Sequence, residues 1–98
     1  MFGFLDVKQV EKFGESLAGL LMERIPPEAS VLGDKSPTKK LFPAVHKLHQ
    51  QIDQFKLEHK MNFYQKAKLL NTFKWQLLSS GYNKEFVDEI TQGLALKL

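Results

Sequence analysis

The spacing of the apolar residues restricts the fold of this 98-residue chain more than any other feature of its sequence. In four segments, leucine, phenylalanine, isoleucine and valine return every three or four residues, which is the period of an α-helix with one buried face. No run alternates apolar and polar residues as a half-buried strand requires. The sequence therefore predicts an all-α fold, and the short connections favour a small antiparallel four-helix bundle.

The first predicted helix covers about residues 6–25, with Asp6 as its N-cap. Gly14 and Ala18 lie four residues apart on this helix, so both would allow a neighbouring helix to approach closely. Pro26-Pro27 ends the helix because neither proline can donate a backbone hydrogen bond. Its predicted buried face consists of Val10, Phe13, Leu17, Leu20, Leu21 and Ile25.

Residues 26–36 are predicted to form a loop, since proline, serine, glycine and aspartate are concentrated there. Ser36-Pro37 is typical of a helix start, but Pro43 follows six residues later. We therefore expect a short helical turn over 37–41 and a separate helix from Pro43 to about Lys60; one helix kinked at Pro43 is the alternative. The predicted buried face of this second helix consists of Leu41, Val45, Leu48, Ile52, Phe55 and His59.

The third predicted helix covers about residues 63–80, with Asn62 as its N-cap and Gly81 as the left-handed residue beyond its end. Asn83 is the predicted N-cap of the fourth helix. No linker divides the chain, so residues 1–98 are predicted to form one domain. The predicted buried faces consist of Phe63, Ala67, Leu69, Leu70, Phe73, Leu77 and Leu78 in the third helix, and of Phe86, Val87, Ile90 and Leu94 in the fourth.

The composition excludes several kinds of chemistry. The chain has no cysteine, so it has no disulfide, no thiolate nucleophile and no cysteine-ligated metal, and a reducing cytoplasmic location is expected. Its serines lack a nucleophile motif and its glycines form no phosphate-binding loop, so neither an enzyme activity nor a cofactor is expected. No apolar run approaches the roughly 20 residues that span a bilayer. The apolar start, residues 1–5, would cap the core or a homodimer contact, or would insert shallowly into a membrane interface.

Positive charge is concentrated in the middle of the chain. Residues 36–74 carry eight lysines against Asp53 and Glu58, a net charge of +6, whereas the whole chain carries +3. This asymmetry indicates that the exposed side of the second and third helices is the working surface. We expect a non-catalytic binding or regulatory module that docks a protein partner there. The expected surface residues are His49, Lys56, Lys60, Tyr64, Lys68, Asn71, Lys74 and Trp75.

Two alternatives remain open for the same part of the chain. The first is nucleic-acid binding, in which the lysines would hold phosphates while Tyr64 and Trp75 stack on bases. Nucleic-acid-binding proteins usually use arginine, however, and Arg24 is the only arginine in the chain. The second alternative is a small metal-binding protein. His46, His49 and Asp53 follow at spacings of three and four, which places them on one helical face where they could share a metal ion.

Overall fold

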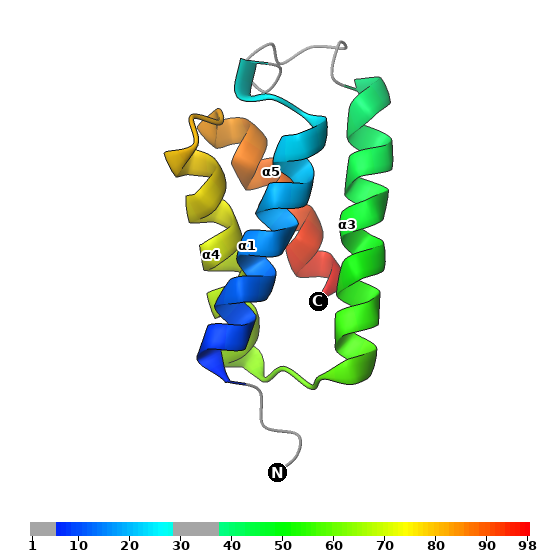
Figure 1. Cartoon of the computed structure of the whole chain (residues 1–98), viewed down its shortest axis with the longest axis vertical. Coiled ribbons are helices and arrows are strands. Elements are labelled where there is room, and N and C mark those ends of the chain that lie inside the picture. The colour runs from blue at the N-terminus through cyan, green and yellow to red at the C-terminus, as the bar shows by residue number, and fades with distance from the viewer. Residues whose placement is uncertain (1–5, 29–37) are drawn as a thin grey trace.

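A computed structural model describes residues 6–28 and 38–98 and confirms the all-α fold, with no strand among these residues. The described residues include four long helices. They lie side by side, and consecutive ones run in opposite directions (Figure 1). They are α1 (Val7–Arg24), α3 (Thr38–Glu58), α4 (Phe63–Ser79) and α5 (Lys84–Lys97). None of the helices in the described part of the chain is long and apolar enough to cross a membrane. The predictions for the apolar start and for most of the loop over 26–36 lie outside the described residues.

The order of the helices around the bundle differs from their order along the chain. α1 packs against α3 and α4, and α5 packs against α4 and contacts α3, whereas the consecutive helices α3 and α4 meet little. The connection over 59–62 crosses one end of the bundle, so α3 and α4 lie diagonally opposite each other (Figure 1). The chain reverses direction twice between α1 and α4, so these two neighbouring helices run in the same direction.

Side-chain caps fix the starts of α1, α4 and α5 at the predicted residues, whereas the predicted start at Ser36 lies outside the described residues. The Asp6 carboxylate accepts a hydrogen bond from the backbone N–H of Lys8, and the side chain of Gln9 accepts one in return from the Asp6 N–H. Asn62 and Gln65 form the same reciprocal pair at the start of α4. These caps satisfy backbone donors that have no partner inside the helix.

The core lies between all four helices, and the predicted faces of α1 and α5 supply much of it. The Tyr82 hydroxyl donates to the backbone carbonyl of Ile25, which ties the α4–α5 turn to the end of α1. At this turn Gly81 has a φ of 94°, the left-handed conformation expected of it. The buried apolar residues are Val10, Leu17, Ala18, Leu21, Ile25, Ala44, Leu48, Ile52, Leu69, Phe73, Leu77, Tyr82, Val87, Ile90 and Leu94.

The structure contradicts the prediction that a separate helix starts at Pro43. α3 is continuous from Thr38, and Pro43 lies inside it, so a single helix passes through this proline, as the alternative required apart from its kink. Pro43 is only the sixth residue of α3, where its missing N–H removes one hydrogen bond near the helix start. Burial of Ala44 and Leu48 directly after it holds this part of α3 against the core.

The predicted buried face of α4 is wrong at its first two positions. Phe63 is 87% exposed and Ala67 is exposed, whereas Leu69, Phe73 and Leu77 are buried. Phe63 precedes Leu69 by six residues, as Ala67 precedes Phe73, and six residues turn the helix to a position about 120° away. The helix turns toward α1 and α5 the line through Leu69, Phe73 and Leu77, which the sequence pattern also predicted to be buried.

Gly14 lies where α1 and α4 are in close contact, as predicted for a residue that allows a neighbouring helix to approach. A Cβ atom built on Gly14 would lie 3.0 Å from the carbonyl oxygen of Leu69 and 3.0 Å from the Cβ of Thr72. Both distances are shorter than ordinary van der Waals contacts, so a larger residue would push the two helices apart. Ala18, one turn further along α1, is also fully buried.

We predict that Gly14→Ala lowers the free energy of unfolding, although alanine favours a helix over glycine by about 1 kcal/mol. The steric cost of separating α1 from α4, typically about 1–3 kcal/mol for an overpacked core, should exceed this gain. Urea denaturation followed by circular dichroism measures the change.

Gly19→Ala is the matched control, because a Cβ at Gly19 meets no atom within 4 Å. This variant should be stabilised by up to about 1 kcal/mol. Equal stabilisation by the two substitutions would show that α1 and α4 are not in tight contact at Gly14.

Candidate functional site

A groove on α4 contains the single tryptophan of the chain. Trp75 is 62% exposed, and the groove around it has a volume of about 460 Å³. Within the described residues, the side-chain amides of Asn71 and Gln76 make no hydrogen bond, whereas the Ser79 hydroxyl donates to the Trp75 carbonyl at 2.8 Å. The α4 groove, as we call it, is lined by Lys68, Asn71, Thr72, Trp75, Gln76 and Ser79. It therefore offers one large aromatic surface and two free amides.

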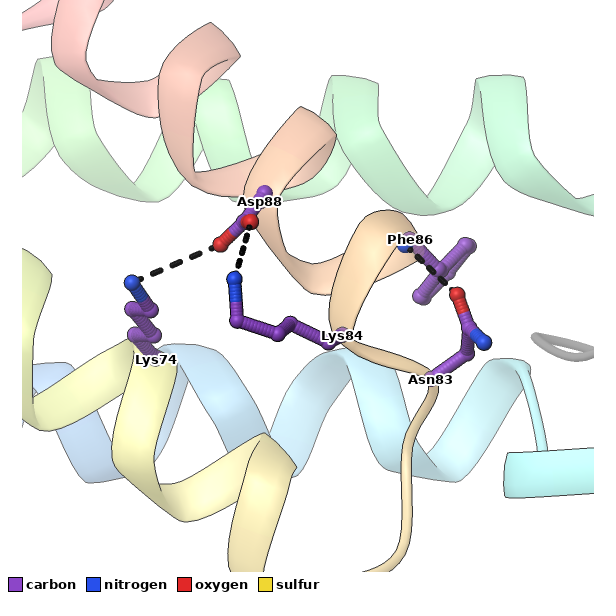
Figure 2. Close-up of polar contacts among 5 residues, drawn as sticks. All are labelled: Lys74, Asn83, Lys84, Phe86 and Asp88. Carbon is purple, nitrogen blue, oxygen red and sulfur yellow. Dashed lines mark hydrogen bonds and ion pairs between the residues drawn. The ribbon is translucent and has the colours of Figure 1, made fainter.

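The two lysines of α4 that the sequence placed on the working surface are paired with carboxylates of other helices. Lys68 lies 3.3 Å from Glu11 of α1. Lys74 lies 3.4 Å from Asp88 of α5, and Lys84 reaches the other oxygen of the same carboxylate at 3.2 Å (Figure 2). The hydrogen bond from Lys84 lowers the pKa of Asp88, and Lys74 adds to this effect while partial desolvation opposes it. Carboxylates of α1 and α5 thus neutralise part of the positive charge of α4.

A second concavity lies where the chain passes from α3 to α4. It has a volume of about 250 Å³, and we call it the basic hollow. Its lining consists of Lys56, His59, Lys60, Met61 and Lys66. The ammonium group of Lys56 donates a hydrogen bond of 2.9 Å to the backbone carbonyl of Lys97 at the end of α5. No carboxylate lines the hollow, so its charge is uniformly positive.

The structure brings five of the eight predicted surface residues to two separate places, whereas His49, Tyr64 and Lys74 line neither. Lys56 and Lys60 line the basic hollow, and Lys68, Asn71 and Trp75 line the α4 groove. Tyr64, 64% exposed, lies in the first turn of α4 and belongs to neither lining. Because α3 and α4 are diagonal in the bundle, their outer faces do not form one continuous surface.

His46, His49 and Asp53 do not form a metal site. The described residues, which include all three, contain no group of three or more histidine, aspartate or glutamate side chains that could hold a metal ion. His46 is exposed, and the Asp53 carboxylate lies 3.2 Å from the ammonium group of Lys97. Helical spacing places such residues on one face, but it does not turn their ligating atoms toward a common point.

His49 has a different environment from an exposed histidine. Its Nε2 atom is buried and has no hydrogen-bond partner among the described residues. Burial lowers the pKa of His49, Lys97 and His46 lower it further, and Asp53 partly opposes them. His49 thus stays neutral in the folded protein at a pH where a solvated histidine begins to take up a proton.

Some of the residues that line the two concavities were not predicted from the sequence. Thr72, Gln76 and Ser79 follow Lys68 at helical spacings, so this spacing could have identified them. Met61 and His59 had no comparable signal, since the shape of the connection between α3 and α4 brings them to the basic hollow.

Comparison with protein-family models, curated proteins and solved structures finds no match to this chain.

We predict that the free energy of unfolding decreases as the pH falls through about 6.5, the ordinary pKa of histidine. The pKa of His49 is lowered in the folded state, so in this range the unfolded chain binds more protons than the folded chain, and acid favours unfolding. His49→Gln should reduce this pH dependence, as measured by urea denaturation between pH 5 and 8.

The exposed residue His46 provides the matched substitution, His46→Gln, which should leave most of the dependence in place. An unchanged slope in His49→Gln would show that another group controls stability in this pH range.

Proposed function

We propose that this protein is a non-catalytic module that docks a segment of a partner protein in the α4 groove. The observation that carries the proposal is Trp75, a large aromatic side chain that is 62% exposed inside a concave surface. Tryptophan is enriched among the residues that contribute most to binding at protein interfaces, especially where a concavity can exclude water around it.

The polar side chains of the α4 groove favour a polypeptide over a small apolar ligand. The amides of Asn71 and Gln76 each offer donors and an acceptor, which match the N–H and C=O groups of a partner backbone. The groove is open along one helix, so an extended or helical segment could lie along it. Trp75 would supply the apolar contact, and the amides would fix the orientation of the segment.

Nucleic-acid binding through the same surface has less support. Lys68 and Lys74 would have to leave Glu11 and Asp88 before they could neutralise phosphates. Binding to a phosphate backbone depends on such cations and falls steeply as the salt concentration rises. Capture experiments on nuclease-treated material therefore separate the two hypotheses.

We predict that Trp75→Ala weakens partner binding by about 2 kcal/mol or more, a reduction in affinity of about thirtyfold. The fold should remain, because substitution of an exposed side chain usually changes stability by at most about 0.5 kcal/mol. Affinity capture from nuclease-treated lysate of the source cell, followed by titration of the purified partner, measures the loss.

Leu96→Ala serves as the control, since Leu96 is 89% exposed on α5 and lies outside the groove lining. The partner should be retained by wild type and by this control and lost only with Trp75→Ala. Retention by all three proteins would contradict the proposal, and so would unfolding of Trp75→Ala, because Trp75 would then be a residue of the core.

A further inference from the structure

We propose that the basic hollow binds a phosphate monoester, supplied by a phosphorylated side chain of the partner that docks in the α4 groove. The source of the phosphate rests on the proposed function, whereas the anion site is argued independently of it. The site consists of Lys56, His59, Lys60 and Lys66, with Met61 as its only lining residue that is not basic.

The distribution of ion pairs leaves unbalanced positive charge at the basic hollow. Eight lysines with described side chains lie between residues 43 and 98. Four of them, Lys68, Lys74, Lys84 and Lys97, are within 3.4 Å of a carboxylate oxygen. Of the other four, Lys56, Lys60 and Lys66 line the hollow, and only Lys47 lies outside it. Lys8 and Lys12 of α1 also make no ion pair among the described residues, but neither lines the hollow, so the three lysines gathered there form a local excess of positive charge.

The residues on both sides of the hollow are held in place by other contacts. The ring of Phe55 stacks on Phe13 of α1, with 4.0 Å between the ring centroids, and also contacts the His59 imidazole at 4.6 Å. Across the hollow, the reciprocal hydrogen bonds between Asn62 and Gln65 fix the first turn of α4, which carries Lys66. A backbone that is ordered on both sides of a site loses less conformational entropy when the ligand arrives.

The charge and size of the hollow match a phosphate monoester better than a carboxylate. Such a group carries a charge of about −1.5 to −2 at neutral pH and has three strong acceptor oxygens. The three ammonium groups could each donate to one of these oxygens. Lysine is an established phosphate ligand because it acts as a compact positive charge. A volume of about 250 Å³ has room for this group and some water, but not for a helix.

The first experiment titrates inorganic phosphate and phenyl phosphate into ¹⁵N-labelled full-length protein and follows the amide resonances. We expect saturable shifts over residues 56–66. The double variant Lys60→Gln/Lys66→Gln should bind about tenfold more weakly, because charge-assisted contacts dominate the binding of a small anion. The charge-matched control Lys12→Gln/Lys47→Gln changes two exposed lysines outside the hollow and should bind as the wild type does.

The absence of saturable shifts, or equal binding by the two double variants, would overturn the proposed site. Tighter binding of a single-stranded oligonucleotide than of phenyl phosphate would also overturn it, in favour of the nucleic-acid hypothesis. Thermal denaturation of each variant shows that a loss of binding is not a loss of fold.

The second experiment tests the source of the phosphate. Partner capture by the wild type should decrease after phosphatase treatment of the lysate, and Lys60→Gln/Lys66→Gln should capture less from untreated lysate. Capture that is unaffected by phosphatase would overturn the inference while leaving the proposed docking function intact. Failure of Trp75→Ala to reduce capture would instead contradict the docking function, so the two failures are distinguishable.

Discussion

The contact between α1 and α4 at Gly14 is the constraint on which the arrangement of the bundle depends. The missing side chain at this position allows the backbone of Leu69 to approach α1. With α1 and α4 adjacent, α3 occupies the other side of α1, and the chain must cross the end of the bundle to reach α4. The two helices that carry most of the lysines are thereby held apart, except where the chain joins them.

This separation determines how the positive charge is distributed. Along the bodies of the helices, Lys68 and Lys74 reach carboxylates on α1 and α5, which are adjacent to α4. Ion pairs at exposed positions contribute little to stability, typically up to about 1 kcal/mol, so their main effect here is to remove free cations from the surface. The connection between α3 and α4 offers no such partner to Lys60 and Lys66 within the described residues, and the free charge remains there.

The two concavities therefore have different chemical characters. The α4 groove combines an indole with uncharged polar groups and suits a polypeptide segment, whereas the basic hollow is small, positive and suited to a single anion. Lys66 and Trp75 are nine residues apart on the same helix, a separation of about 14 Å along its axis. They also lie about half a turn apart around the helix, so a partner that contacts both places must extend around α4.

The sequence by itself determined the helices, their caps and most of the core. Apolar spacing, Asn62, Gly81 and Asn83 act locally, through helix periodicity and through hydrogen bonds between residues close in the chain, so their effects can be predicted from the sequence. The tertiary structure decided which helices are neighbours. Those neighbours determine whether each side chain is buried, exposed or paired with a charge on another helix. It left Phe63 exposed, carried α3 through Pro43, kept His46, His49 and Asp53 from forming a metal site, and divided the lysines into paired and unpaired sets. The physical reason is that burial, ion pairing and ligand geometry depend on contacts between residues far apart in the chain, and the spacing within one helix does not specify those contacts.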